Sequence, residues 1–306
     1  MKSSAVIALS SVSKWYGNVV AVSDVSFEIQ PGITGLLGPN GAGKTTILRM
    51  MSGLAAASEG QVTVFGQNPR TTPELYRRIG VMSEHETGYE FMTGRQFVRM
   101  AAQLRDVESP HQAAVVAIEL VDLLDAADRR IRSYSRGMKQ RIRLAAMLVH
   151  DPDLLILDEP LNGADPRQRL QFQSLLRSLA DAGRTIVVSS HILEEIEMLA
   201  TRVLLIVNGK LAAEGDYHAI RAALDDRPYH VRVICDAPRA LAAALVGLDA
   251  VDSVQVDPDG AVVVLSSNMG ALQTSMARVA KDRSVRLTRV EPLDDTLESV
   301  FEYLVA

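Results

Sequence analysis

The sequence predicts an α/β fold built on a parallel sheet, followed by a second, smaller α+β domain. Through residue 215, apolar runs alternate with helical patterns, which is typical of parallel strands joined by crossover helices. A chain of 306 residues is too long for one small domain and long enough for two. From residue 216 the order of the elements and the charge both change, so we expect a domain boundary there.

The first domain is expected to span residues 1–215. Apolar runs indicate buried strands at 33–37, 154–157, 185–189 and 202–207, and helical patterns occupy 44–53, 136–149, 167–182 and 192–200. Asn208 and Gly209 are typical of a hairpin turn. Residues 93–127 contain two helical stretches and no strand. This predicts an inserted helical lobe covering about residues 85–150.

The second domain is expected at 216–306. Strands are indicated at 230–235, 251–256, 261–265 and 285–290, and helices at 238–246, 269–280 and 293–304. This β-α-β-β-α-β order is that of a ferredoxin-like split unit. From residue 216 there are 9 Lys and Arg against 14 Asp and Glu, whereas the preceding part has 23 of each, so the whole net charge of -5 lies on the second domain.

Composition excludes several classes of protein. A hydrophobic content of 47% argues against disorder, and a net charge of -5 argues against a nucleic-acid partner. The single cysteine, Cys235, excludes a disulfide within the chain and indicates a reducing compartment. Its apolar neighbours predict a small buried side chain. No apolar run approaches the roughly 18–20 residues of a spanning helix, and the stretch at 5–9 is too short for a signal peptide. We therefore expect a soluble chain whose membrane role, if any, comes from a partner.

A phosphate-binding loop is predicted at residues 38–46, between a strand and a helix. The residues that fit G-x-x-x-x-G-K-[ST] are Gly38, Pro39, Asn40, Gly41, Ala42, Gly43, Lys44 and Thr45, with Thr46 following. The glycines let backbone N–H groups surround the phosphates, and the helix start adds its positive end. We expect Lys44 to reach the β- and γ-phosphates and Thr45 to hold Mg²⁺. A chance glycine-rich turn is disfavoured because both flanking elements are present.

Two acids end the apolar strand at 154–157. Asp158 is suited to holding Mg²⁺, and Glu159 to orienting and deprotonating the attacking water. Alone, the two acids would indicate only a solvated turn. Together with the loop at 38–46, they predict a P-loop NTPase.

The stretch 134–141 separates P-loop proteins from one another. It reads Y-S-R-G-M-K-Q-R and precedes a predicted helix. Here the sequence resembles the ATP-binding subunits of ABC transporters, whose equivalent motif is LSGGQ. The resemblance implies that Ser135 and Gly137 contact the γ-phosphate bound by a second subunit. Arg136 and Met138 depart from the common form, and that departure is similar to exporter-type subunits. The end of the chain, at 291–301, resembles the closing element of drug-, sodium- or copper-type exporter ATPases. Ser135 is also an ordinary helix N-cap.

The same resemblance covers residues 4–215 and implies roles for three further residues. Tyr16 falls where an aromatic ring stacks on adenine, although Trp15 is adjacent and competes for that role. Asp165 belongs to the loop at 162–165 that crosses the dimer interface in this family. His191 takes the place of the switch histidine, which contacts the γ-phosphate and is expected to act with Glu159 and Lys44 in catalysis.

Glu84 occupies the position where the family usually has glutamine. A carboxylate there adds a negative charge near the metal and the attacking water. One hypothesis is that Glu84 ligates or approaches Mg²⁺ and links the site to the helical lobe. The alternative, an exposed loop acid, is equally well supported by the sequence.

The resemblance implies an ATPase that uses ATP and Mg²⁺, pairs with a second copy of itself, and drives export through a separate integral-membrane permease at the cytoplasmic face of the cell membrane. A soluble ABC ATPase of translation or repair is the alternative, disfavoured by the single cassette and the absence of heptads. A metabolite kinase would not need the stretch 134–141. The cargo remains open, as does the choice between ligand regulation and dimer stabilisation for the second domain.

Overall fold

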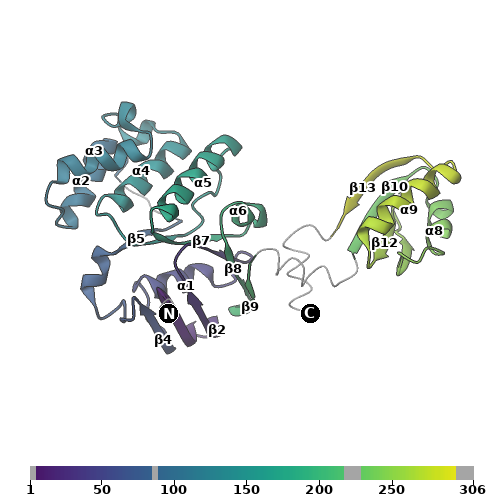
Figure 1. The fold of residues 1–306 in the computed structure, drawn as a ribbon, viewed down its shortest axis with the longest axis horizontal. Coiled ribbons are helices and arrows are strands. Elements are labelled where there is room, and N and C mark those ends of the chain that lie inside the picture. The colour runs from purple at the N-terminus through teal and green to yellow at the C-terminus, as the bar shows by residue number, and fades with distance from the viewer. Residues whose placement is uncertain (1–4, 85–88, 217–228, 294–306) are drawn as a thin grey trace. The chain divides into compact units, whose positions relative to one another are not determined.

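The computed structural model describes residues 5–84, 89–216 and 229–293. Contacts within the chain divide it into two compact units, Met1–Tyr217 and His218–Ala306 (Figure 1). The helix expected at 293–304 lies almost wholly outside the described residues.

A six-stranded sheet forms the centre of the first unit, in the order β5-β6-β7-β3-β8-β9. The strands are β3 (Ile33–Leu37), β5 (Ile79–Met82), β6 (Leu154–Leu157), β7 (Thr185–Ser190), β8 (Arg202–Val207) and β9 (Lys210–Gly215). All pairings are parallel except that of β8 with β9, which are joined at Asn208 and Gly209 as predicted. The predicted parallel sheet is therefore confirmed, and the carboxyl ends of β3, β6 and β7 lie at one edge.

A second sheet of the first unit was not predicted. It is antiparallel, in the order β2-β1-β4, with β1 (Ile7–Tyr16), β2 (Val19–Ile29) and β4 (Glu59–Val64). Irregularities interrupt the register of β1 against β2, and Ser11 and Asp24 have positive φ. These bulges break the apolar–polar alternation from which a strand is recognised.

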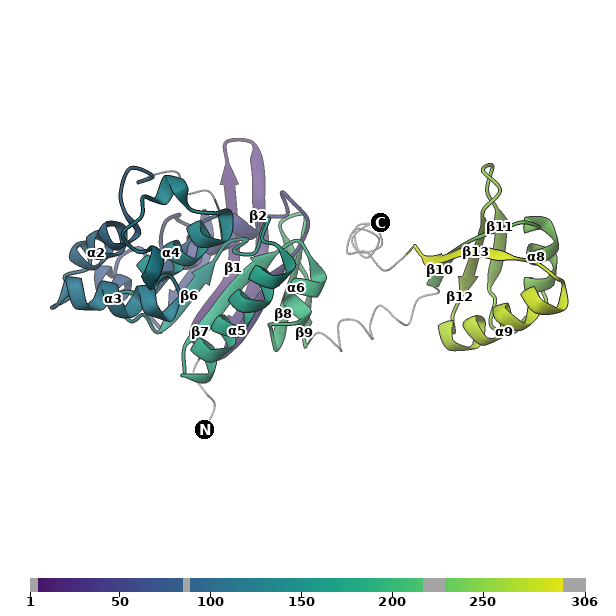
Figure 2. The same ribbon diagram turned by 90° about the horizontal axis from the view of Figure 1, so that it is seen from above.

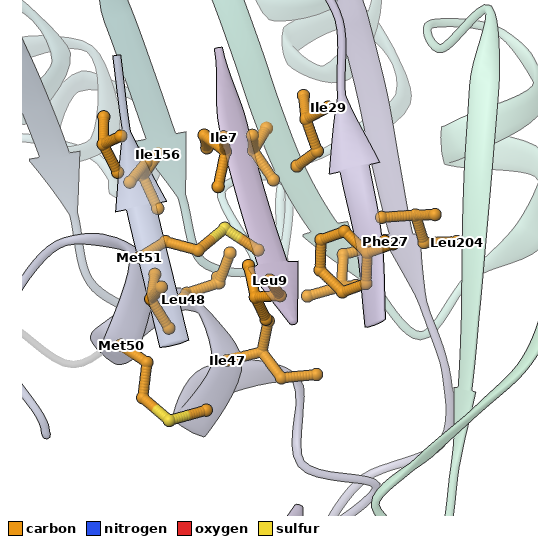
Figure 3. Packing of buried hydrophobic residues seen from close by; sticks show 14 of the residues in the cluster. Ile7, Leu9, Phe27, Ile29, Ile47, Leu48, Met50, Met51, Ile156 and Leu204 are labelled. Atoms are coloured by element: carbon orange, nitrogen blue, oxygen red, sulfur yellow. The ribbon is translucent and has the colours of Figure 1, made fainter. Parts of the chain in front are cut away.

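Helix α1 (Lys44–Met51) contributes to one hydrophobic cluster with residues of both sheets. Figure 3 shows its side chains among those of β1, β2, β6 and β8. The labelled residues are Ile47, Leu48, Met50 and Met51 on the helix, and Ile7, Leu9, Phe27, Ile29, Ile156 and Leu204 on the strands. Because the helix starts at Lys44, within the predicted phosphate loop, this packing fixes the loop between two sheets.

The helical lobe consists of α2 (Gly94–Leu104), α3 (Pro110–Leu120) and α4 (Arg136–Leu148), which contact one another (Figure 1). Thr93 and Gln96 form a capping box at the start of α2. Short 3₁₀ turns lie at Pro73–Arg77, Leu124–Ala126 and Ile131–Ser133. The lobe was predicted in kind and approximate place.

Two more helices, α5 (Pro166–Asp181) and α6 (Leu193–Glu197), complete the first unit. The prediction of a helix over 192–200 was wrong in length. The N–H groups of Leu199 and Ala200 both donate to the carbonyl of Ile196. The N–H of Thr201 donates to Ile33 O as the chain enters β8. Pairing with β3 thus ends the helix early.

In the second unit the elements follow the order β-α-β-β-α-β (Figure 2). They are β10 (Tyr229–Cys235), α8 (Pro238–Leu245), β11 (Ser253–Val256), β12 (Val262–Ser266), α9 (Met269–Asp282) and β13 (Leu287–Pro292). The sheet has the order β11-β12-β10-β13 with antiparallel pairings throughout. Cys235 is half-buried at the margin of the core of this unit and is less buried than predicted, because it is the last residue of β10.

None of the helices in the described ranges combines the length and the apolar character that crossing a membrane requires.

A polar contact ties the helical lobe to the sheet. Arg105, which follows α2, donates to the carbonyls of Tyr76 and Ile79 and lies 3.0 Å from His150 Nε2. Burial of the imidazole, with the guanidinium beside it, lowers the pKa of His150 from 6.5 to about 4. His150 is therefore neutral in the folded protein at pH 7.

This shift predicts a pH-dependent loss of stability. The unfolded chain takes up a proton at His150 near the ordinary pKa of 6.5, whereas the folded chain does so only near 4. The neutral, buried imidazole contributes fully to the free energy of unfolding above about pH 6.5. This contribution is lost as the pH falls toward 4, since the unfolded state binds more protons in that window. Urea unfolding between these pH values should show a shallower pH slope for His150→Gln than for the unsubstituted protein. His111→Gln, on an exposed site of α3, is the control. Equal slopes in all three proteins would contradict the assignment.

Candidate active site

The loop at 38–46 connects β3 to α1, as predicted. Its glycines are required by close packing of the backbone. A Cβ at Gly38 would lie 2.2 Å from Ile206 O, and one at Gly43, whose φ is +103°, would lie 2.4 Å from Ala21 O. No side chain fits at either position without moving backbone atoms. The loop is thus held against β8 and β2.

The Lys44 ammonium group is buried, with 5% of the residue exposed. Its Nζ donates to Gly38 O at 2.7 Å and to Pro39 O at 3.2 Å, and it lies 3.2 Å from Glu159 Oε1. The other carboxylate oxygen of Glu159 lies 2.9 Å from His191 Nδ1. Glu159 therefore connects the phosphate loop with the end of β7, and it contacts both of the other residues predicted to act in catalysis.

Ser189 holds the two acids that follow β6. Its hydroxyl donates to Asp158 Oδ1 at 2.7 Å and accepts from the N–H of Glu159 at 2.8 Å. Glu159 has a φ of +47°, an unfavourable conformation for a residue with a side chain. The hydrogen bond from its N–H to a fully buried hydroxyl stabilises that turn. Sequence reasoning missed Ser189, because a serine inside an apolar strand carries no pattern of its own.

A cavity of about 600 Å³ lies over the phosphate loop. Its lining comprises Asn40, Gly41, Ala42, Gly43, Lys44, Thr45 and Thr46 of the loop together with Ala21, Glu84, Glu159, Asn162 and His191. Backbone N–H groups, a buried ammonium and a helix start converge here, which is the chemistry that binds phosphate chains. The donor set therefore fits the triphosphate of ATP.

A smaller cavity, of about 150 Å³, adjoins the same loop. Thr45, Asp158 and Glu84, the three residues predicted to hold a metal, all line it. In the described part of the chain, no three His, Cys, Asp or Glu residues cluster as a metal site of their own. One hydroxyl and one or two carboxylates suit Mg²⁺, which usually takes its remaining ligands from phosphates and water. Glu84 also accepts a hydrogen bond from Asn162 Nδ2 at 3.2 Å.

A buried acid lies behind His191. Glu195 is 3% exposed, accepts a hydrogen bond from the Ser190 hydroxyl at 2.7 Å, and lies 3.3 Å from Arg169 Nε. Burial raises the pKa of the Glu195 carboxyl. The acid joins the segment after β7 to helix α5, and thus supports the residue next to His191. No sequence signal distinguished it from Glu194 or Glu197.

The other predicted site residues lie apart from the cavity over the phosphate loop. Ser135 caps α4 and accepts from Met138 N–H, and Asp165 caps α5 and accepts from Gln168 N–H. Tyr16 and Trp15 are both exposed at the end of β1, and Lys14 Nζ lies 4.8 Å from the centre of the Tyr16 ring. Within the described residues, these positions and Gly137 do not line that cavity. One chain therefore brings together only part of the predicted set of site residues.

Comparison with known proteins agrees with this geometry. The family model described as ABC transporter matches residues 22–162. The Nod factor export ATP-binding protein I of Paraburkholderia xenovorans is 37% identical, over 83% of this chain and 78% of its own length. The bacitracin transport ATP-binding protein BcrA of Bacillus licheniformis is 33% identical, over 99% of this chain and 98% of its own length. The match to one further relative spans 64% of that protein's length, which is less than two thirds.

A solved structure shows the same fold. The nucleotide-free ATP-binding cassette from an ABC transporter superimposes with a TM-score of 0.67 at 22% identity, over 72% of this chain and 96% of that chain. The match supports the predicted fold class for the first unit.

The Ser189 contacts predict a measurable cost of removing one hydroxyl. Ser189→Ala leaves the Glu159 N–H buried without its acceptor and should lower the free energy of unfolding by about 1–3 kcal/mol. Urea denaturation measures this change. Ser178→Ala, whose exposed hydroxyl bonds only within α5, should change stability by less than about 0.5 kcal/mol. Equal costs for the two variants would show that the Ser189 bonds do not stabilise the turn.

Proposed function

The chain belongs to the ABC transporter family as an ATP-binding subunit, a family that hydrolyses ATP to drive transport, and from this premise we propose that two copies close around two Mg-ATP molecules to power export through a separate membrane permease. Closure needs two copies because each site takes Lys44, Asp158 and Glu159 from one chain and Ser135 from the other. One observation carries the proposal. The side chains suited to phosphate and water chemistry converge in one cavity, whereas Ser135 and Asp165 cap helices elsewhere.

Each residue of the first half-site has a role that follows from its position. Lys44 and the loop N–H groups bind the β- and γ-phosphates. Thr45 and Asp158, with Glu84 beside them, would hold Mg²⁺, which neutralises phosphate charge when bound. Glu159 accepts the proton of the attacking water. His191, in contact with Glu159, orients that carboxylate and stabilises charge on the γ-phosphate.

Residues of the second half-site act on nucleotide held by the partner copy. Ser135 and the N–H groups at the start of α4 face its γ-phosphate, since a helix start is an anion-binding site. Gly137 offers its backbone N–H group from the first turn of that helix. Asp165 stands at the start of α5, in the segment that crosses the interface. Tyr16 stacks on adenine, and its exposed ring supports this assignment over a core role.

The helical lobe is the proposed contact with the permease, at the cytoplasmic face of the membrane. A cavity of about 1160 Å³ lies between β5, α2 and α4, with Phe97, Met100 and Leu104 in its lining. Phe91 and Leu104 are 73% and 74% exposed, and exposed apolar surface of this kind is typical of a binding face. An apolar contact suits a membrane subunit better than it suits nucleic acid, which disfavours the soluble alternative.

We also propose that residues 1–215 are the nucleotide-binding domain and that residues 216–306 are an accessory domain of ferredoxin-like type. The β11-β12-β10-β13 order and the antiparallel pairings support that type.

Glu159→Gln tests the proposal directly. The amide cannot accept the proton of water, so the hydrolysis rate should fall by about 10²–10⁴-fold. ATP should then hold the protein as a dimer in size-exclusion chromatography with light scattering. Glu119→Gln, an exposed acid on α3, removes the same charge and should leave hydrolysis and assembly unchanged. A Glu159→Gln protein that stays monomeric with ATP and hydrolyses it at the normal rate would refute the proposal.

Glu84→Gln tests the metal-side hypothesis. Removing a carboxylate beside Thr45 and Asp158 should raise the Mg²⁺ concentration for half-maximal ATPase by about tenfold. A Mg²⁺ titration of ATPase, basal and in the presence of the permease, measures this shift. Glu74→Gln, on the exposed Pro73–Arg77 turn, is the matched control. If both activities of Glu84→Gln equal those of the control, Glu84 is a loop acid without a role at the metal.

A further inference from the structure

The start of α4 and the segment 162–168 are packed into each other. A Cβ at Gly163 would lie 2.1 Å from Arg136 Cζ, and a Cβ at Gly137 would lie 2.2 Å from Gln168 Oε1. Gln140 Nε2 also donates to the carbonyl of Asn162 at 3.2 Å. Each element thus places a long side chain over a glycine of the other.

These contacts explain, from within the chain, why both positions are glycine. Arg136, from the first turn of α4, covers the face of Gly163 where a side chain would stand. Gln168, from the first turn of α5, covers Gly137 in the same way. The Asp165 cap fixes the start of α5 through the N–H of Gln168. The packing is reciprocal, because each helix start places the end of a long side chain on a glycine of the other segment.

We propose that Arg136 and Gln168 are positioning residues that hold the start of α4 and the segment 162–168 as one body, so that the half-site offered to the second copy is formed before the two copies meet. The inference rests on the proposed ATP-dependent dimer. It also gives a reason for the departure of Arg136 from the common glycine, because its guanidinium occupies the space beside Gly163.

These side chains stand apart from the phosphate loop. Neither Arg136 nor Gln168 lines the cavity around Lys44, and Arg136 lines the larger cavity of the helical lobe, which extends to Asp158 and Glu159. Arg136 is exposed and Gln168 is half-buried, so truncating either one leaves no large core cavity. Their loss acts on the geometry of the second half-site, and a misplacement of about 1 Å in such a site can cost on the order of 100-fold in rate.

The first test measures ATP affinity and ATP-dependent dimerisation separately, with every variant built on Glu159→Gln. Arg136→Ala and Gln168→Ala should keep the ATP affinity and melting temperature of the parent. Their dimer dissociation constant with saturating ATP should rise by about tenfold or more. Gln168→Met keeps an unbranched side chain over Gly137 and should stay within about threefold of the parent. Arg99→Ala and Gln171→Ala, exposed on α2 and α5, should not change assembly.

The second test exchanges the glycine under Arg136. Gly163 and Gly66 have φ values of +68° and +75°, and only Gly163 has atoms within 4 Å of an added Cβ. Alanine imposes similar backbone strain at both sites, so a larger loss of dimerisation in Gly163→Ala reports the clash with Arg136. Adding Arg136→Ala to Gly163→Ala should remove the part of the loss that comes from the clash, so the two effects should not be additive.

Ser135→Arg on the same background distinguishes the two levels of the proposal. If this variant still dimerises with ATP, the shared site itself is wrong. If it blocks dimerisation while Arg136→Ala and Gln168→Ala assemble like the parent, the shared site stands and the positioning role is refuted. Equal effects of Gly163→Ala and Gly66→Ala, or additive effects of Gly163→Ala and Arg136→Ala, would refute it as well.

Discussion

The buried contact between Lys44 and Glu159 is the interaction on which the site depends. Both residues are less than a tenth exposed, so each charge has little water and needs a partner. Removing one member of such a pair commonly costs about 3–5 kcal/mol, because the other charge is left buried without compensation. The pair therefore constrains two loops at once, one after β3 and one after β6. The strand order β6-β7-β3 places those ends two strands apart, with β7 and His191 between them.

That constraint explains why the turn after β6 is built in an unfavourable conformation. Glu159 needs a positive φ to direct its carboxylate between Lys44 and His191, and Ser189 stabilises the turn from the neighbouring strand. The same serine orients Asp158 toward the smaller cavity with Thr45. Strain at an active site persists only where surrounding contacts determine it, and here they come from β7, the residue after β7 and the start of α1.

Sequence patterns predicted those parts of the molecule whose signal is local. The loop at 38–46 and the acids after β6 have fixed spacings next to fully buried strands, so their elements and contacts could be expected. The antiparallel sheet β2-β1-β4 was missed because its bulges break the alternation of β1. Ser189 was missed because a serine in an apolar strand has no pattern of its own, and Glu195 because it is one of three glutamates in its segment; both gain their meaning from a partner far along the chain. The packing of Arg136 on Gly163 is of the same kind: the sequence shows the departure, and only the fold shows what it contacts.

Helix α4 contacts both the segment 162–168 and residues next to Glu84 in the chain. Its first turn is packed against the segment 162–168, and two later residues hold the segment that contains Glu84: Lys139 pairs with Glu90 at 2.5 Å, and Arg143 donates to Ser83 O. Lys139 and Arg143 are one turn apart on the same helix, so they contact Glu90 and Ser83 from one face. Glu84 in turn accepts from Asn162. Helix α4 is thus linked through these contacts to Glu84 beside the smaller cavity and to Glu90 in the lining of the cavity of the lobe.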